Sequence, residues 1–350
     1  MDDVRPRVLM LGPDRNSKGG IASVVNQYFD AGLQNQVELT YISTACDGNN
    51  INKYAQFCSG IIKFFKIINN VDIVHIHMAS RGSYRRKRQF VVWAKQKKKK
   101  VIIHLHGGEF KIFYDEEADV KLKSDICKIL NLGDKVIVLS NEWKEFIDTI
   151  VEPEKVVVVH NAVALNHKSH LENQSIIFLG KLGKGKGVYD LIDAMPYVIK
   201  NHPDVMLLLA GDGEIEKCRK KATENRTIAN IKFLGWIDSE TKKKLLSESS
   251  IFVLPSYNEG LPMSMLEAMS FGLPVVVSDA GGIPAVIHDG ENGLLVHAGD
   301  INKLSVVLTE VLEDVELRYK LGKSAFDTIN KFFSIDKQLR KLLNMYKSLL

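Results

Sequence analysis

The sequence predicts an α/β chain built from two domains, each with a parallel sheet covered by helices. Short apolar segments that suit buried strands alternate with amphipathic helical patterns along the chain, and this alternation is typical of parallel sheets with right-handed crossovers. The apolar segments form two series, and a length of 350 residues suits two domains of roughly 150 residues each. A glycine-rich turn also follows the first segment of each series.

The first series of strands predicts a domain over residues 1–163. Each segment is short and apolar, as expected of a strand buried in a parallel sheet. The predicted strands are Val8–Leu11, Val37–Ile42, Ile73–His77, Val101–Leu105, Val136–Leu139 and Val156–Val159.

The second series predicts a domain over residues 164–333. The polar stretch Ala162–Gln174 lacks periodicity and is interpreted as the linker between the domains. Residues 334–350 have an amphipathic pattern and predict a closing helix. The predicted strands of this domain are Ile176–Leu179, Met206–Ala210, Ile231–Leu234, Ile251–Leu254 and Pro274–Val277.

The bulk composition excludes several classes of protein. With 45% hydrophobic and 25% charged residues, the chain resembles ordinary globular proteins. No apolar run approaches the roughly 18 residues that a membrane span needs. Residues 1–12 contain only a short apolar run, so we expect no secretory signal and a cytoplasmic location. The cysteines have no paired spacing, which predicts neither zinc nor disulfides; they are Cys46, Cys58, Cys127 and Cys218.

Basic residues are concentrated in one part of the first domain. Residues 61–100 contain twelve Lys and Arg residues and one acid, Asp72, although the net charge of the chain is only +5. Both ends of the helix expected over residues 81–100 are basic, and we expect this segment to rest on the anionic inner face of a membrane. A solvated helix end is the plainer alternative. Nucleic acid is not expected as a partner, because no nucleic-acid-binding motif accompanies the charge.

The segment from Glu259 to Asp279 is the most informative part of the sequence. Pro262 suits the first position of a helix, and we expect a short helix over residues 263–271 followed by a buried strand. The free amides at such a helix start bind anions. Glu259 and Glu267, eight positions apart, can accept hydrogen bonds from hydroxyl groups. The segment therefore predicts a site for a sugar nucleotide, with the diphosphate on the amides and the hydroxyls on the carboxylates.

Three glycine-rich turns follow predicted strands. Gly19 and Gly20 open a helix after the first strand, where backbone amides can approach a phosphate or a sugar. Residues 180–187 carry lysines among glycines, which suits a diphosphate whose charge grows as it leaves. Gly211 begins a third turn, at the edge of the same sheet where ligands of such folds bind. For the first and third turns, an ordinary strand-to-helix connection is an equally good explanation.

Four histidines lie at the ends of two neighbouring strands. His75 and His77 share one strand face, as do His104 and His106. Histidine is a common metal ligand, but no Cys or Asp ligand spacing accompanies these residues, and we do not expect a metal. We expect His75 and His104 to be core residues and His106 to reach a cleft from the end of its strand.

Taken together, these motifs resemble a known family. The Glu259-x7-Glu267 segment continues through Asp279 to Gly293 and accompanies Gly180-Lys181-x4-Lys186-Gly187 and the Gly19-Gly20 turn. The combination resembles the retaining GT-B glycosyltransferases of family 4 over nearly the whole chain. The resemblance implies two Rossmann-like domains facing a cleft, a nucleotide-sugar donor held mainly by the second domain, and no required metal or other cofactor. It also implies that the closing helix packs back on the first domain.

The resemblance implies roles for individual residues. Glu267 would bind the ribose, Glu259 the donor sugar, Lys186 the diphosphate, and His106 would lie near the reacting carbon. Lys181 occupies a position that is usually Arg in this family, and Lys lacks the planar two-point grip on phosphate. The catalytic candidates are therefore His106, Lys181, Lys186 and Glu259. The donor-binding candidates are Gly19, Gly20, Gly211, Gly260, Leu261, Pro262, Met263, Ser264 and Glu267.

The sequence thus predicts a hexosyltransferase that moves a sugar from a nucleotide diphosphate, UDP first and GDP second, to a glycan or lipid-diphosphate-linked acceptor. Cell-surface polysaccharide assembly is the expected setting. Two alternatives remain open. One is another enzyme on the same fold, such as a sugar-nucleotide epimerase or a phosphorylase. The other is a protein that binds the nucleotide sugar without transferring it. A nicotinamide-dependent oxidoreductase is not expected, because neither half has a GxGxxG turn after its first strand.

Overall fold

The computed structural model describes residues 5–106, 109–166 and 174–350. The chain forms two compact units. Residues 1–162 and 335–350 make the N-terminal unit, and residues 163–334 make the C-terminal unit. These limits differ by one residue from those expected from the sequence. Part of the expected linker, residues 167–173, lies outside the described residues.

The N-terminal unit contains a six-stranded sheet in the order β2-β1-β3-β4-β5-β6. Every neighbouring pair is parallel. Each strand lies within one residue of its predicted limits, because each is an apolar run that ends at a turn or a helix start. The strands are β1 Arg7–Gly12, β2 Glu38–Ser43, β3 Ile73–Met78, β4 Lys100–Leu105, β5 Lys135–Val138 and β6 Val156–Val158.

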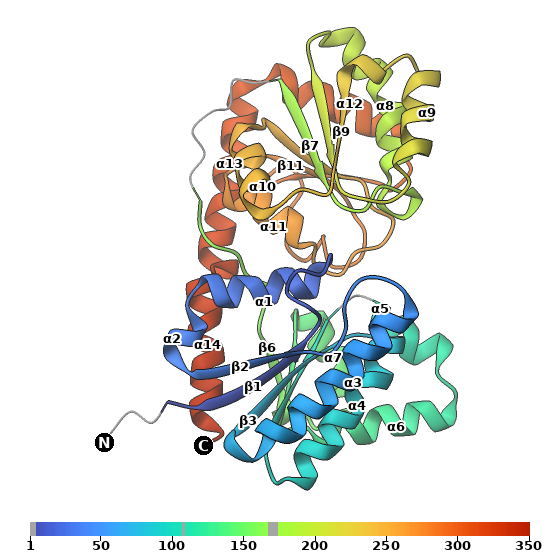
Figure 1. Cartoon of the computed structure of the whole chain (residues 1–350). Coiled ribbons are helices and arrows are strands. Elements are labelled where there is room, and N and C mark those ends of the chain that lie inside the picture. The colour runs from blue at the N-terminus through green and yellow to red at the C-terminus, as the bar shows by residue number, and fades with distance from the viewer. Residues whose placement is uncertain (1–4, 107–108, 167–173) are drawn as a thin grey trace. The chain divides into compact units, whose positions relative to one another are not determined.

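Helices cover both faces of this sheet (Figure 1). One face packs against α3, α4, α6 and α7 in a single apolar core. The other face packs against α1 and the closing helix α14, which contact each other. The predicted return of the closing helix to the N-terminal unit is confirmed. The helices are α1 Gly20–Asp30, α2 Leu33–Gln36, α3 Asn50–Ile67, α4 Arg81–Gln96, α5 Glu109–Ile112, α6 Val120–Leu132, α7 Asn141–Asp148 and α14 Ile335–Ser348.

The C-terminal unit contains a second parallel sheet, in the order β12-β11-β10-β7-β8-β9. Numbered within the unit, this is the doubly wound order 3-2-1-4-5-6 of dinucleotide-binding folds. The α/β fold with two Rossmann-like domains is therefore confirmed. The sequence missed β12, a short and only half-buried edge strand. The strands are β7 Ser175–Leu179, β8 Met206–Ala210, β9 Ile231–Gly235, β10 Ile251–Leu254, β11 Val275–Ser278 and β12 Leu294–Val296.

The strand order places a topological switch point between β7 and β10, whose following turns lead away to opposite sides. Ligands of such sheets bind outside the carboxyl ends of the strands at this point. Within the described part of the chain, no helix is both long and apolar enough to cross a membrane. The helices of the unit are α8 Val188–Asn201, α9 Ile215–Glu224, α10 Ser239–Glu248, α11 Met263–Ser270, α12 Ile301–Glu313 and α13 Val315–Thr328.

Candidate functional site

The turn after β7 is packed against the segment after β10 by a glycine. Gly187 has a left-handed φ of 66° and precedes α8. A Cβ at this position would lie 1.9 Å from the carbonyl oxygen of Pro255, so no other residue allows the two segments to approach so closely. The backbone N–H of Tyr257 also donates to the carbonyl of Gly185 at 3.1 Å. The two turns at the switch point are therefore one packed unit.

This packing brings Lys186 and Glu259 together. The Lys186 Nζ lies 2.5 Å from Glu259 Oε1, and the Ser256 hydroxyl donates to the same oxygen at 2.8 Å. The Glu259 side chain is only 8% exposed, whereas Lys186 is 34% exposed. The sequence predicted a role for each residue but not their contact, which joins turns 73 residues apart.

The loop after β11 supports the backbone beside Glu259. Gly281 has a left-handed φ of 57°, and a Cβ there would lie 1.7 Å from the Glu259 carbonyl oxygen. The backbone N–H of Gly282 donates to the Gly260 carbonyl at 3.0 Å. Close backbone packing therefore fixes the loop that carries Glu259.

Glu267 lies on α11 and is buried. Its Oε1 accepts a hydrogen bond from the Lys242 Nζ, 2.6 Å away on α10. Pro262 is the N-cap of α11, with an extended ψ of 122°, and not its first helical residue as predicted. No side chain of the described residues caps this helix, which leaves its first turn, Met263 and Ser264, available to a ligand.

Lys181 and Gly211 lie on neighbouring turns beyond this cluster. A Cβ at Gly211 would lie 1.8 Å from the Gly180 carbonyl oxygen, so packing between the turns already explains this glycine. Lys181 is exposed. Its charge contributes to lowering the pKa of the Glu214 carboxyl, after hydrogen bonds from Tyr189 and Lys217.

In the N-terminal unit, the Gly19-Gly20 turn leaves the start of α1 open. Gly19 is the N-cap with a φ of 147°, and no side chain of the described residues caps the helix. A Cβ at Gly19 or Gly20 would meet no atom within 4 Å. The space beside this turn is therefore open, in contrast to the packed glycines of the C-terminal unit.

The four predicted histidines form a buried cluster between the sheet and α14. His106 Nε2 lies 2.8 Å from His77 Nδ1, and His75 Nε2 lies 3.2 Å from His104 Nδ1. The hydroxyl of Tyr346 on α14 lies 2.6 Å from His75 Nδ1. Burial lowers the pKa of His75 and of His106 to about 3, so both rings are neutral near pH 7 and each offers one donor and one acceptor.

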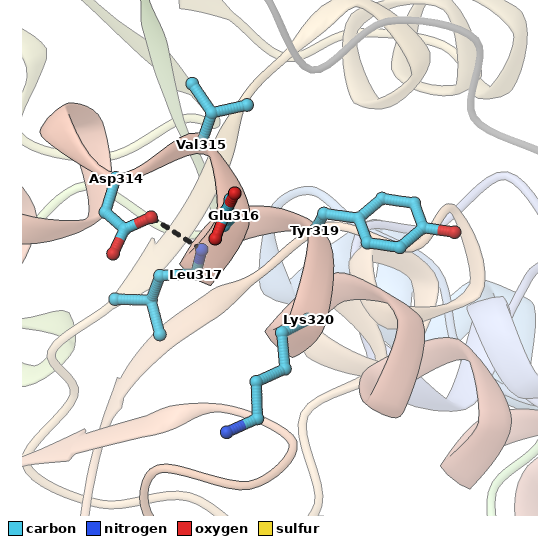
Figure 2. A pocket seen from close by; sticks show the side chains of 6 residues that line it. All are labelled: Asp314, Val315, Glu316, Leu317, Tyr319 and Lys320. Atoms are coloured by element: carbon cyan, nitrogen blue, oxygen red, sulfur yellow. Dashed lines mark hydrogen bonds between the residues drawn. The ribbon is translucent and has the colours of Figure 1, made fainter.

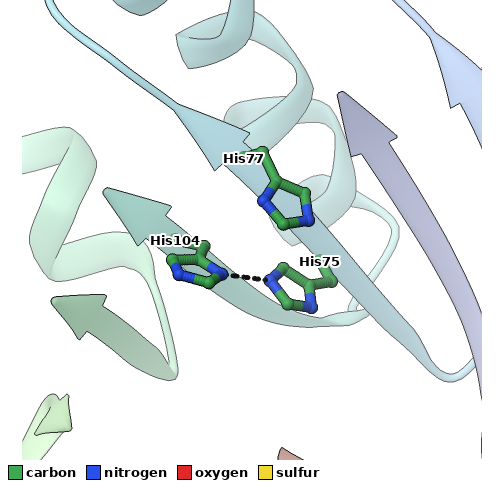
Figure 3. A group of neighbouring side chains, drawn as sticks. All are labelled: His75, His77 and His104. Carbon is green, nitrogen blue, oxygen red and sulfur yellow. Dashed lines mark hydrogen bonds between the residues drawn. The ribbon is translucent and has the colours of Figure 1, made fainter. Parts of the chain in front are cut away.

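Three of these rings have nitrogens close enough to suggest a metal centre (Figure 3). Ligand atoms of His75, His77 and His104 lie within 4.8 Å of one another, and the Nε2 atoms of His77 and His104 have no partner among the described residues. The rings are stacked, with interplanar angles of 13° for His75–His77 and 24° for His75–His104. Stacked rings do not aim their lone pairs at one point, and His75 already uses both nitrogens. The geometry supports the interpretation of His75 and His104 as core residues.

Lys87 is a buried lysine beside this cluster that sequence reasoning did not single out. Its Nζ donates to the His77 carbonyl at 2.5 Å, and burial lowers its pKa to about 7. Lys87 shares one helix face with Phe90, Val91 and Ala94, all buried. This spacing was the signal that separates Lys87 from the other basic residues of the segment.

Acids compensate much of the charge of residues 81–100. Arg81 pairs with Glu109 and Glu117, and Arg88 pairs with Asp125. Lys95 Nζ lies 2.9 Å from Asp134. The acids come from later elements, which is why the sequence count overstated the charge available to a partner. The lysines of this segment that are exposed are Lys97, Lys98 and Lys100.

A surface hollow also lies at the first turn of α13 (Figure 2). Its lining comes from residues 314–320 alone, and the Asp314 carboxylate accepts from the Leu317 N–H at 2.8 Å as a helix cap. None of the predicted site residues lines it. We therefore assign it no ligand.

Two family models match adjoining parts of the chain. The model described as "Glycosyltransferase Family 4" matches residues 29–167, and the model described as "Glycosyl transferases group 1" matches residues 165–328. Together they include the histidine cluster and every predicted site residue of the C-terminal unit.

Curated relatives carry glycosyltransferase names. The Escherichia coli UDP-Gal:alpha-D-GlcNAc-diphosphoundecaprenol alpha-1,3-galactosyltransferase is 28% identical over 340 residues, which cover 90% of this chain and 84% of that protein. A GDP-mannose-dependent monoacylated alpha-(1-6)-phosphatidylinositol monomannoside mannosyltransferase of Corynebacterium glutamicum is 33% identical over 171 residues, 47% of this chain and 44% of that protein. Among solved structures, Anabaena HepE in complex with UDP superposes with a TM-score of 0.76 at 17% identity, over 98% of this chain and 100% of that one.

Proposed function

Because this chain belongs to glycosyltransferase family 4, we propose that it transfers a sugar from a UDP-sugar to a glycan or lipid-diphosphate-linked acceptor with retention at the anomeric carbon. Membership of the family makes the chain a hexosyltransferase. The identity of the donor, the identity of the acceptor and the stereochemistry of transfer are what we propose here. The named role of the E. coli relative, which combines a UDP-sugar with a diphosphoundecaprenol-linked acceptor, supports it. Cell-surface polysaccharide assembly is the proposed setting.

The observation that carries the proposal is the pair of Lys–Glu contacts beside the switch point. Lys186 with Glu259 and Lys242 with Glu267 place cations and hydroxyl-accepting carboxylates where nucleotides bind in this sheet order. In the proposed complex, Lys186 exchanges Glu259 for the diphosphate, and the released carboxylate accepts hydrogen bonds from the donor sugar. Glu267, held by Lys242, accepts from the ribose hydroxyls.

The other donor contacts follow the helix start and the open turn. The amides of Gly260, Leu261, Met263 and Ser264 line the sugar and phosphate, and Pro262, which has no N–H, fixes the entry of α11. Gly20, at the open start of α1, is assigned to the phosphates or the sugar.

In the proposed reaction, the acceptor oxygen attacks the anomeric carbon from the face that the diphosphate leaves. The bond from this carbon to the phosphate oxygen breaks as the new glycosidic bond forms, and the acceptor proton passes to the departing phosphate. Lys181 and Lys186 stabilise the charge that develops on the diphosphate. We assign His106, directly after β4, to the neighbourhood of the reacting carbon, and its Nε2 lies 2.8 Å from His77 Nδ1. Neither a covalent nucleophile nor a metal is required.

We place the enzyme at the anionic inner face of a membrane, where a lipid-linked acceptor is located. The exposed lysines near the end of residues 81–100, Lys97, Lys98 and Lys100, supply the charge for this contact. Arg81, Arg88 and Lys95 are paired with acids and contribute less, whereas exposed Arg85 adds charge near the start of the segment.

A donor panel with and without a lipid-diphosphate-linked sugar tests the proposal. We expect UDP release from a UDP-hexose to depend on the acceptor and the product to keep the anomeric configuration of the donor, as read by NMR coupling constants. Conversion of the donor without acceptor would favour an epimerase, and dependence on inorganic phosphate a phosphorylase. Donor binding with neither transfer nor hydrolysis would favour a binding protein. Preference for GDP-mannose, the donor named for the Corynebacterium relative, would mean that the nucleoside of the donor is guanosine and not uridine.

A further inference from the structure

Helix α3 of the N-terminal unit is apolar on two sides but buried on only one. Phe57 and Phe64 face inward and pack on Phe90 of α4, with ring centroids 5.9 and 5.2 Å apart. On the other side, Ile51, Tyr54, Ile62 and Phe65 are 76%, 71%, 59% and 43% exposed. A helix that is apolar all round is usually buried all round. We call these four exposed residues the outer stripe.

The outer stripe is a continuous row along α3. Its members follow one another at intervals of three, eight and three residues, and half-buried Cys58 fills the gap, so that all lie on one side of the helix. Phe65 also packs on Trp93, with ring centroids 5.2 Å apart, whereas Ile51, Tyr54 and Ile62 are all more than half exposed. Figure 1 shows α3 beside α4 on the same face of the N-terminal sheet. Contiguous exposed apolar patches of this kind mark interaction surfaces.

The charged residues of α3 itself are all basic. The sequence has no acidic residue between Asp47 and Asp72, whereas α3 contains Lys53, Lys63 and Lys66. Lys63 and Lys66 lie next to Ile62 and Phe65 and are exposed, and neither forms an ion pair with the described residues. A protein partner of ordinary composition does not require such a strictly basic border, but an anionic lipid surface does.

The basic end of α4 extends this surface. Lys99 Nζ donates to the Asn69 carbonyl at 3.1 Å, just after α3 ends, so residues 97–100 lie beside the C-terminal end of α3. Their exposed lysines are therefore continuous with Lys63 and Lys66. Tyr54 and Phe65 add aromatic rings, which favour the boundary between lipid and water.

We propose that α3 is a membrane-binding helix, whose outer stripe enters the headgroup region of an anionic bilayer while Lys63, Lys66 and residues 97–100 contact lipid phosphates. The orientation is that of an interfacial amphipathic helix that lies in the plane of the membrane. The proposal rests on the proposed function in one respect, because the lipid-linked acceptor is the reason for such binding. It relocates the contact from residues 81–100 as a whole to α3 with the end of α4.

Co-sedimentation of the full chain with vesicles tests this proposal. We expect binding to phosphatidylglycerol-containing vesicles at low salt, weak binding to pure phosphatidylcholine, and loss of binding as salt is raised. The variant Tyr54→Ser/Ile62→Ser removes apolar area at exposed positions, and Lys63→Gln/Lys66→Gln removes charge. Each should lower the partition coefficient about tenfold without changing the melting temperature.

Matched controls lie in the C-terminal unit. Val315→Ser/Tyr319→Ser changes apolar residues that are 53% and 62% exposed, and Lys217→Gln/Lys220→Gln removes two exposed lysines of α9. Neither should affect vesicle binding. Equal loss in the controls, unchanged binding in the α3 variants, or equal binding of the wild type to neutral vesicles would overturn the proposal.

Two further measurements separate the possible failures. Sedimentation velocity of the wild type and of Tyr54→Ser/Ile62→Ser should give the same mass; a wild-type dimer that this variant dissociates would assign the outer stripe to a second copy of the chain instead. Transfer to a short-chain, water-soluble acceptor should be unchanged in both α3 variants. Absent vesicle binding with intact transfer would therefore reject only the membrane contact, whereas absent transfer by the wild type would reject the proposed function.

Discussion

The ammonium group of Lys186 lies 2.5 Å from the carboxylate of Glu259, across the switch point between β7 and β10. In the absence of donor, each residue compensates the charge of the other. In the proposed complex, a diphosphate replaces this carboxylate as the partner of Lys186, so that the ion pair would be exchanged when the donor binds.

Lys186→Ala should slow transfer far more than it lowers stability. The lysine is 34% exposed, so its replacement opens no cavity. The substitution does, however, remove a positive charge that would stabilise the departing diphosphate. We expect kcat to fall about a hundredfold, or roughly 3 kcal/mol of transition-state stabilisation. The control is Lys184→Ala, an exposed lysine of the same turn, which should retain activity. A loss under about threefold would exclude Lys186 from diphosphate stabilisation.

Glu267→Ala should weaken nucleotide binding, because the ribose loses a charged acceptor and Lys242 loses its partner. The expected loss is roughly 1.5–3 kcal/mol in UDP affinity, measured by calorimetry. Glu224→Ala, at an exposed position on α9, is the control. Unchanged affinity in a folded Glu267→Ala protein would remove this residue from the site.

The sequence predicted most of the fold and the residue types of the site, but not the contacts between them. Strands such as β3 and β10 are apolar runs bounded by turn or helix-start residues, which local patterns detect. β12 is short and half-buried, so it leaves no such pattern. Lys242 was missed because its contact with Glu267 joins two helices, and no local rule pairs residues 25 positions apart. Lys87, by contrast, could have been found from its spacing to the buried residues of α4.

Lys181→Arg should retain activity and can raise it. Lys181 is exposed, so the larger guanidinium has room, and it offers phosphate a two-point contact that an ammonium lacks. Steady-state kinetics with the preferred donor provide the measurement. Complete loss of transfer would mean that the site is shaped around lysine.

Chelation should leave transfer intact. Lysines and helix amides provide the positive charge for the diphosphate in this proposal, and the stacked histidines do not converge on a metal position. Activity after treatment with EDTA and gel filtration should equal that of the untreated enzyme. Loss that manganese or magnesium restores would show that a divalent ion takes part.

Acid should destabilise the N-terminal unit through its buried histidines. The pKa of His75 is lowered by burial to about 3, whereas an unfolded histidine has a pKa of about 6.5. Below pH 6.5 the unfolded chain therefore binds a proton that folded His75 does not, and the free energy of unfolding falls as the pH drops toward 3. The slope for one such group is about 1.4 kcal/mol per pH unit.

His75→Gln should reduce this slope by about one proton, because glutamine can still bond Tyr346 but does not titrate. Urea unfolding between about pH 7 and pH 5 in a Trp236→Phe background gives the measurement, since Trp93 and Trp143 then report on the N-terminal unit alone. His297→Gln is the control. Asp279 raises the pKa of His297. The stability that His297 contributes is therefore present at low pH and lost as the pH rises, which is opposite in sign to the effect of His75. Replacing His297 should thus not reduce the slope of the free energy of unfolding with pH. Identical slopes for the wild type and His75→Gln would show that His75 becomes protonated without unfolding the sheet.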